Sequence, residues 1–227
     1  MHRLLPLLIM LLFACTEKSE PIPAWQVSTG ANLRFDIRLD SQIYRLSNFG
    51  EPPQMAIWME NETSGDVRTL WVTSRMATGV WVGKVVCPTA LPYWVSRREI
   101  ETDGSIPSYL KPLPDGITGA TPKEDLTIFT RVDSATTWSY YLELNVSGDY
   151  NVDFPASMPN GTPDPDGNGQ PSLIYGGTIT VEPGASSTGN YLGMTDQWRA
   201  VDEIDTMRSG LTTADKVLQD FHVRYIP

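Results

Sequence analysis

The chain has 227 residues, of which 41% are hydrophobic and 19% charged, and its formal net charge at pH 7 is −10. This length and composition suffice for one domain with a packed core, and all-β domains of about 200 residues are common. The acidic balance excludes a phosphate-backbone partner, so we expect no binding to nucleic acid.

The first 14 residues have the features of a bacterial signal peptide. Arg3 supplies a positive charge, and the apolar run 4–14 is too short for a bilayer-spanning helix, which needs about 20 residues. The run ends in Leu-Phe-Ala-Cys, which resembles the processing site of bacterial lipoproteins, where the cysteine becomes the acylated N-terminus. We therefore predict lipidation at Cys15, with the membrane as a partner through this lipid anchor. An ordinary secretory signal that ends near a cysteine is the alternative.

Lipidation at Cys15 predicts where the protein works. Bacterial lipoproteins of this kind carry two or three acyl chains, and two chains suffice for stable anchoring. Thr16 follows the cysteine, where an aspartate would indicate retention at the inner membrane. We expect the periplasmic face of the outer membrane. The domain organisation is then a signal peptide (1–14), the lipidated cysteine with a flexible tether (15–30), and a folded domain (31–227).

Beyond the tether, apolar and polar residues alternate in short runs, which is typical of half-buried strands. In chain order, strands are predicted at residues 33–39, 54–60, 67–72, 79–86, 126–132, 138–146, 150–154, 173–181 and 221–226. Short helices are predicted at 91–98 and at 214–220, the second capped by Thr213. Irregular loops are predicted at 103–123, 155–171 and 184–193. The absence of a strand–helix rhythm disfavours a parallel sheet, so we predict an all-β fold, a single immunoglobulin-like β-sandwich with long loops and one or two short helices.

Three further residue types carry expectations about burial. Cys87 has no cysteine left for an intramolecular disulfide once Cys15 is lipidated, and its place at the end of an apolar strand predicts a buried thiol. The tryptophans at strand positions indicate core packing rather than a sugar-stacking face. Arg97 and Arg98 are interpreted as solvated surface, with a grip on an anionic ligand as the alternative.

Six short segments along the domain carry a family resemblance: residues 55–60, 67–70, 91–94, 115–122, 170–175 and 211–223. Together they resemble an uncharacterised predicted periplasmic domain family, catalogued as domain of unknown function 2271, over roughly residues 30–226. This resemblance implies a β-sandwich of the cell envelope and supplies no established activity.

Residues 115–121, with the sequence DGITGAT, are similar to the acceptor motif of proteins that hold FMN through a phosphoester to the final threonine. The similarity implies flavin attachment at Thr121, with Gly119 as a small flanking residue and Asp115 as the upstream acid. The residues that follow, Pro-Lys-Glu, depart from the hydroxyl-rich continuation of such modules. The alternative interpretation is a turn, because Asp-Gly pairs favour tight turns and glycine accepts positive φ.

An acidic loop resembles the first half of a calcium loop. Asp164, Asp166 and Asn168 supply oxygens at positions one, three and five, and a glycine stands at position six. Position twelve is a tyrosine instead of a glutamate, so a calcium ion would need another carboxylate, for instance Asp153 or Glu182. The alternative is again a turn, in which Asp and Asn side chains bond their own backbone.

These features lead to three functional hypotheses. The first is a lipid-anchored binding or accessory module of the envelope, without catalytic residues of its own, that partners an envelope protein. The second is a periplasmic redox carrier with FMN on Thr121 and a membrane redox partner. An enzyme is disfavoured, because His2 leaves with the signal peptide and only His222 remains, which excludes a two-histidine zinc site or relay.

Overall fold

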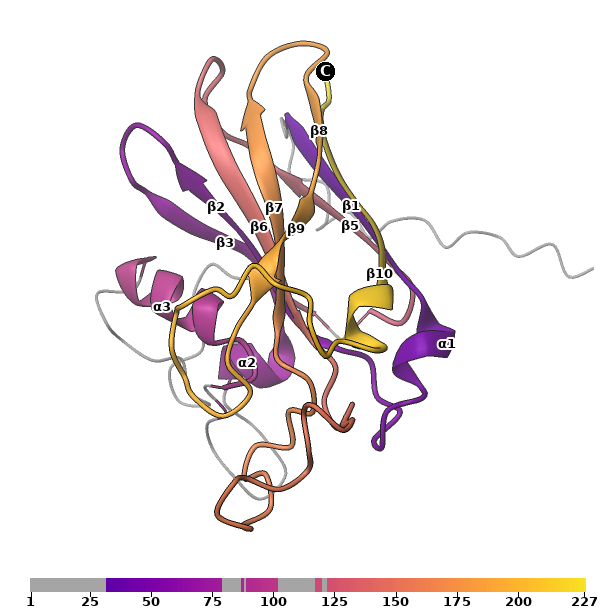
Figure 1. Ribbon diagram of the computed structural model, residues 1–227. Coiled ribbons are helices and arrows are strands. Elements are labelled where there is room, and N and C mark those ends of the chain that lie inside the picture. The colour runs from indigo at the N-terminus through magenta and orange to yellow at the C-terminus, as the bar shows by residue number, and fades with distance from the viewer. Residues whose placement is uncertain (1–31, 79–86, 88, 102–116, 120–121) are drawn as a thin grey trace, which may run out of the picture.

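The computed structural model describes residues 32–78, 87, 89–101, 117–119 and 122–227. Within these residues two β-sheets pack face to face (Figure 1). The smaller sheet has the strand order β5-β1-β10-β8, and the larger has the order β4-β3-β2-β6-β7-β9. The predicted all-β sandwich is confirmed. The predicted signal peptide, Cys15, the tether and the predicted strand at 79–86 lie outside the described residues.

In the smaller sheet, the first and last strands of the described chain lie side by side. β1 (Leu33–Leu39) pairs with β10 (Leu218–Tyr225) on one side and with β5 (Asp125–Thr130) on the other, both antiparallel. The short strand β8 (Ser186–Thr188) extends the sheet beyond β10. Alternate residues of β1 are buried, as the alternation in the sequence predicts.

The larger sheet is antiparallel except at one edge, where β4 runs parallel to β3. Its strands are β2 (Gln54–Asn61), β3 (Val67–Thr73), β4 (Ile117–Gly119), β6 (Thr137–Asn145), β7 (Leu173–Thr180) and β9 (Asn190–Met194). In β6, Tyr140, Leu142 and Leu144 belong to the core between the two sheets. Because successive side chains of a strand point to opposite faces, Tyr141 and Glu143 lie on the outer face.

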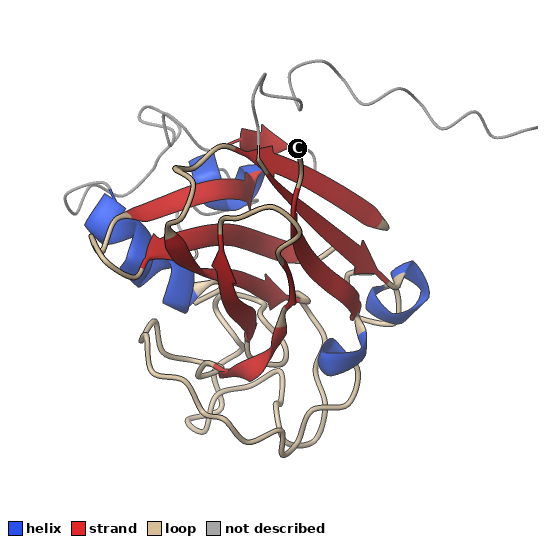
Figure 2. Ribbon diagram, turned by 90° about the horizontal axis from the view of Figure 1, so that it is seen from above, coloured by secondary structure: helices blue, strands red, loops and turns tan. Residues whose placement is uncertain are grey.

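Helices cover that outer face. α2 (Ser74–Thr78) and α3 (Pro92–Glu101) pack on β3, and a second apolar cluster that includes Trp58 and Trp94 fills the space beneath them. The helical segments lie outside the strand layers (Figures 1 and 2). α1 (Ser41–Tyr44) follows β1. None of the helices in the described part of the chain has the length and apolar character that crossing a bilayer requires.

Four sequence predictions of secondary structure are wrong in the described part of the chain. The predicted loop 103–123 contains the strand β4, because residues 117–119 find the edge of β3 to pair with. Residues 150–154 form a turn instead of a strand, because the Asn151 side chain accepts from the N–H groups of Asp153 and Phe154 (2.9 and 2.8 Å). The predicted loop 184–193 contains most of β8 and β9. The helix predicted at 214–220 is only a 3-10 turn, Ala214–Lys216, and its N-cap residue Thr213 makes no capping hydrogen bond.

The burial predictions are confirmed for the cysteine and four tryptophans and wrong for the two arginines. Cys87 is buried, and four of the described tryptophans are 0–4% exposed: Trp58, Trp71, Trp94 and Trp138. The interpretation of Arg97 and Arg98 as solvated surface is wrong. Arg98 is 2% exposed with its guanidinium over the Trp94 ring, and Arg97 stacks half-buried on Tyr93.

Candidate functional site

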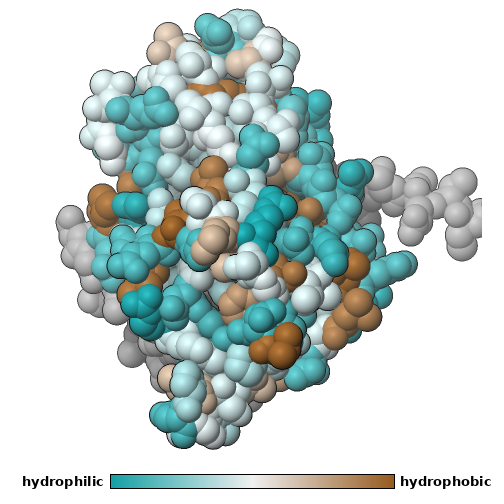
Figure 3. Space-filling view, viewed as in Figure 1, coloured by the Kyte–Doolittle hydropathy of each residue, from teal (hydrophilic) through white to brown (hydrophobic). Residues whose placement is uncertain are grey.

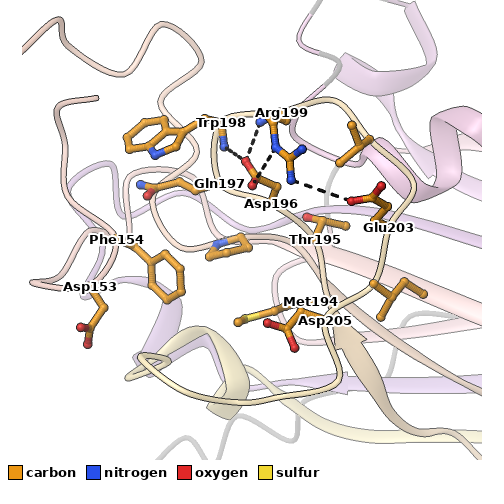
Figure 4. Close-up of a pocket in the computed structure, with 13 residues that line it drawn as sticks. Asp153, Phe154, Met194, Thr195, Asp196, Gln197, Trp198, Arg199, Glu203 and Asp205 are labelled. Atoms are coloured by element: carbon orange, nitrogen blue, oxygen red, sulfur yellow. Dashed lines mark hydrogen bonds and ion pairs between the residues drawn. The ribbon is translucent and has the colours of Figure 1, made fainter. Parts of the chain in front are cut away.

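A pocket with a volume of about 580 Å³ opens beside the C-terminal end of β9. Most of its lining comes from residues 194–205, and the rest comes from Asp153, Phe154 and Pro171 (Figure 4). The pocket therefore joins the segment that follows β9 to the two segments that precede β7. No single stretch of the sequence forms it.

The wall at residues 196–199 is a turn built on one carboxylate. Oδ1 of Asp196 accepts from the N–H groups of Trp198 and Arg199, both at 2.8 Å, and Oδ2 accepts from Nε of Arg199 at 3.1 Å. Partial burial alone would raise the pKa of Asp196, but these hydrogen bonds and the guanidinium together hold that pKa below its ordinary value. Asp196 is thus an ionised structural element of the wall.

The opposite wall is formed by residues 204–205 of the same polypeptide, which pair with the end of β9. Met194 and Asp205 exchange two backbone hydrogen bonds of 2.8 Å. This close approach depends on Gly193, since a Cβ built there would lie 2.0 Å from Cγ2 of Ile204 and 2.7 Å from the carbonyl oxygen of Asp205. A hydrogen bond from Nε2 of Gln197, which belongs to the first wall (196–199), to the carbonyl of Pro155 (3.0 Å) connects that wall to the neighbouring loop.

The pocket is acidic. Its described lining carries the carboxylates of Asp153, Asp196, Glu203 and Asp205 against one guanidinium, that of Arg199. Arg199 is already paired with Asp196 and lies 3.9 Å from Glu203. The lining also presents two aromatic side chains, Phe154 and Trp198, which Figure 4 shows on one side of the pocket. A positively charged group would meet both carboxylates and aromatic rings here.

The floor of the pocket leads into the interior through hydroxyl groups. Thr195 lines the pocket, and its Oγ1 lies 2.7 Å from Oγ of Ser172. Ser172 in turn donates to Oε1 of Glu143 at 2.5 Å. Thr195 is 5% exposed, whereas Ser172 and Glu143 are fully buried. Burial raises the pKa of Glu143 to about 7, although hydrogen bonds from Ser172, Trp94 and Tyr93 oppose that rise.

The carboxylates of the calcium-like loop are engaged in hydrogen bonds, whereas Asn168 is buried, donates from Nδ2 to the carbonyl of Thr89 (2.9 Å), and has no hydrogen-bond partner for its Oδ1 among the described residues. The two oxygens of Asp164 accept from the N–H groups of Asp166 (2.9 Å) and Asn168 (2.8 Å), and the Tyr150 hydroxyl also donates to Asp164. Asp166 accepts from the Thr89 hydroxyl. This is the self-capping geometry of the turn interpretation.

The other carboxylates proposed for calcium do not join the loop in one cluster. Asp153 lines the pocket of Figure 4. Glu182 lies beyond the last residue of β7. The eight residues of this strand, at 3.3 Å each, separate it from the loop by roughly 25 Å. Among the described residues there is no group of three or more His, Cys, Asp or Glu side chains placed to hold a metal.

The flavin motif is described only in part. Gly119 ends β4, where it pairs with Thr73 of β3, so the described part of the motif is the edge strand of the larger sheet. Thr121 and Asp115 lie outside the described residues, as does Cys15. Flavin attachment and lipidation stay predictions.

Comparison with known proteins gives no relative for this chain. No protein-family model matches it, and no significant match exists among curated proteins or solved structures. The geometry of the pocket therefore carries the functional argument alone.

Proposed function

We propose that the chain is a bacterial lipoprotein, anchored through Cys15 at the periplasmic face of the outer membrane, whose β-sandwich is a binding or accessory module. The signal-like segment 1–14 and the cysteine that follows it support the location. The pocket beside β9 is the proposed ligand site, and its acidic lining is the observation that carries the proposal.

The ligand that fits this lining is a cation, such as a primary amine, a polyamine or a basic side chain. Asp153 and Asp205 line the pocket, and neither has a paired guanidinium among the ion pairs of the described residues. Opposite charges about 4 Å apart attract by about 1 kcal/mol in bulk water and by more near a protein surface. Phe154 and Trp198 add a cation–π surface, and an anion would be repelled by the same groups.

The experiment is a calorimetric titration of the soluble domain with spermidine at physiological ionic strength, which measures the binding affinity. We expect the double variant Asp153→Asn/Asp205→Asn to bind at least about tenfold more weakly, since it loses two uncompensated charges of about 1 kcal/mol each. The asparagines keep the size of the aspartates and an acceptor oxygen, including the one that accepts from the N–H of Met207.

Glu182→Gln is the matched control, because it removes an exposed carboxylate at the opposite end of β7. If this variant weakens spermidine binding as much as the pocket variant does, the interaction is a general effect of net charge and the proposal fails. A flavin absorbance on native protein, lost on Thr121→Ala, would instead favour the redox-carrier alternative.

A further inference from the structure

A continuous line of hydrogen bonds joins the pocket floor to a carboxylate beneath α3. It consists of Thr195, Ser172 and Glu143, and we call it the hydroxyl chain. The O···O distances are 2.7 Å between Thr195 and Ser172 and 2.5 Å between Ser172 and Glu143. At its inner end, the two oxygens of Glu143 also accept from the N–H groups of Tyr93 (3.3 Å) and Trp94 (2.6 Å), which open the first turn of α3.

Such a chain has a direction, because each hydroxyl has one proton to donate. When Glu143 is ionised it can only accept, so Ser172 donates inward and Thr195 donates to Ser172. The lone pairs of Thr195 are then left for the pocket. When Glu143 is protonated it can donate to Ser172, which donates to Thr195 in turn. The Thr195 proton can then turn toward the pocket, in competition with the long hydrogen bond from Thr195 to the carbonyl of Ser172 (3.5 Å).

We infer that the protonation state of Glu143 decides whether Thr195 offers the pocket a hydrogen-bond acceptor or a donor, and thereby controls the affinity for a cationic ligand. This inference rests on the proposed function of the pocket. An ammonium group can only donate, so it is matched to the ionised state and mismatched to the protonated state. By reciprocity, a bound cation must favour loss of the Glu143 proton.

Within the hydroxyl chain, Glu143 is the group that titrates, because its surroundings are mostly apolar. Its cross-strand neighbours are Ala56 of β2 and Ile174 of β7, both apolar. The titratable or charged side chains of α3 are those of Tyr93, Arg97, Arg98, Glu99 and Glu101. Tyr93 and Cys87 belong to the buried cluster beneath the helix, and Tyr141 of β6 packs against it. Beyond Thr195, the nearest charged residue along the chain is Asp196 in the pocket wall. Burial dominates the pKa shift of Glu143, and its other causes among the described residues are the hydrogen bonds from Ser172, Trp94 and Tyr93.

The decisive experiment measures spermidine binding between pH 5.5 and 8.5 by calorimetry in two buffers of different ionisation enthalpy. We expect the affinity to rise about tenfold across neutral pH, which is the effect of one hydrogen bond to a charged group. Binding near pH 6.5 should release a fraction of a proton, and this release should disappear above about pH 8.5, well above the Glu143 pKa of about 7.

Matched variants separate the hydroxyl chain from other causes. Thr195→Val keeps the shape of the side chain but removes the link, so the pH dependence should be lost, whereas Thr195→Ser should retain it. Glu143→Gln should also abolish it. His222→Gln removes the imidazole of β10, in the other sheet, and should leave the pH dependence unchanged.

A second measurement requires no ligand and guards against variants that fold poorly. Carbon-13 NMR of labelled glutamate side chains follows the Glu143 carboxyl directly, with Glu143→Gln identifying its signal. Ser172→Ala should move the titration midpoint upward, because the Ser172 hydrogen bond lowers the pKa of Glu143. Saturating spermidine should move the midpoint of the unmodified protein downward.

The outcomes are distinguishable. If spermidine binds with an affinity independent of pH and the Glu143 midpoint does not move, the inference is overturned while the binding pocket stands. If spermidine fails to bind at every pH, the proposed function and the inference are overturned together.

Discussion

At the scale of single residues, Glu143 is the least expected feature of this protein. The alternation of β6 places it on the face opposite Tyr140 and Leu142, where a sequence pattern predicts solvent. The structure instead places α3 over that face, and the carboxylate accepts from the first free N–H groups of the helix. Acidic groups are favoured at helix N-termini, so Glu143 acts as a cap supplied by the sheet.

This burial makes the stability of the fold depend on pH. The pKa of Glu143 is about 7 in the folded protein against an ordinary value of 4.5, so between these values the folded state binds more protons than the unfolded chain. Stability must then fall as pH rises, with the full contribution present below about 4.5 and lost above about 7. The shift corresponds to ~3 kcal/mol.

Glu143→Gln should therefore remove this pH dependence. We expect the free energy of unfolding of the unmodified protein to fall by ~3 kcal/mol relative to the variant between about pH 4.5 and 7.5. Urea denaturation at several pH values measures it. The glutamine also loses one acceptor, which adds an offset, so the difference in slope is the quantity to compare. Parallel curves for the two proteins would contradict the prediction.

At the scale of elements, alternation predicted the strands that carry large apolar side chains and missed those that do not. β8 and the start of β9 consist of Ser, Thr and Asn, with Gly189 between them, so their sequence resembles a loop. They form strands because β7 and β10 present edges to pair with. Gly189 is required there, since a Cβ would lie 2.3 Å from the Phe221 ring.

The pocket could not be predicted for a related reason. Its walls come from segments before β7 and after β9, and they meet only through tertiary contacts such as the bond from Gln197 to Pro155. Of the local sequence signals, the acidic loop at 164–170 forms turns, and the described part of the strip at 115–121 is the edge strand β4. The Asp196 turn does have a local signature, because an aspartate two and three residues before the N–H groups that it accepts from is typical of an Asx turn.

The pairing of β9 with residues 204–205 should depend on Gly193. We expect Gly193→Ala to lower the free energy of unfolding by at least about 2 kcal/mol and to weaken spermidine binding, because the new methyl group would overlap Ile204 and the Asp205 backbone. Thermal unfolding and the same calorimetric titration measure both effects.

Gly184→Ala provides the comparison for this variant. Its Cβ would meet nothing within 4 Å, but its φ of +84° makes it cost about 1–2 kcal/mol from backbone strain alone. Spermidine binding should be unchanged. If Gly193→Ala were as stable as the unmodified protein and bound spermidine equally well, the close pairing of the wall would be refuted.

At the scale of the whole molecule, the two ends of the sandwich have different surroundings. β1 starts at Leu33, opposite Tyr225, close to the C-terminus (Figure 1). The other end of β1 leads to the pocket side. There the N–H of Asp40 donates to the carbonyl of Val217, and Thr213 of the adjoining turn accepts from Gln170, which precedes Pro171 of the pocket. The face in Figure 3 is mainly hydrophilic with scattered apolar groups, which suits recognition through charge.

An anchor at Cys15 would therefore enter the domain at the end away from the pocket. We expect native protein to partition into the detergent phase in a phase-separation assay, with an intact mass that begins at Cys15 and includes acyl chains. Cys15→Ser should partition into the aqueous phase. Cys87→Ser, which alters the buried thiol instead, should leave partitioning unchanged. An unmodified N-terminus at another residue would contradict the anchor and the location inferred from it.

The same geometry predicts that anchoring leaves the pocket accessible. Residues 16–32, between the anchor and the start of β1, can span at most roughly 55 Å, and the seven residues of β1 add about 23 Å of separation from the membrane. Lipidated protein in phosphatidylcholine vesicles should thus bind spermidine with the affinity of the soluble Cys15→Ser variant. A markedly weaker affinity in vesicles would mean that the pocket faces the bilayer. The orientation deduced from the two ends of β1 would then be wrong.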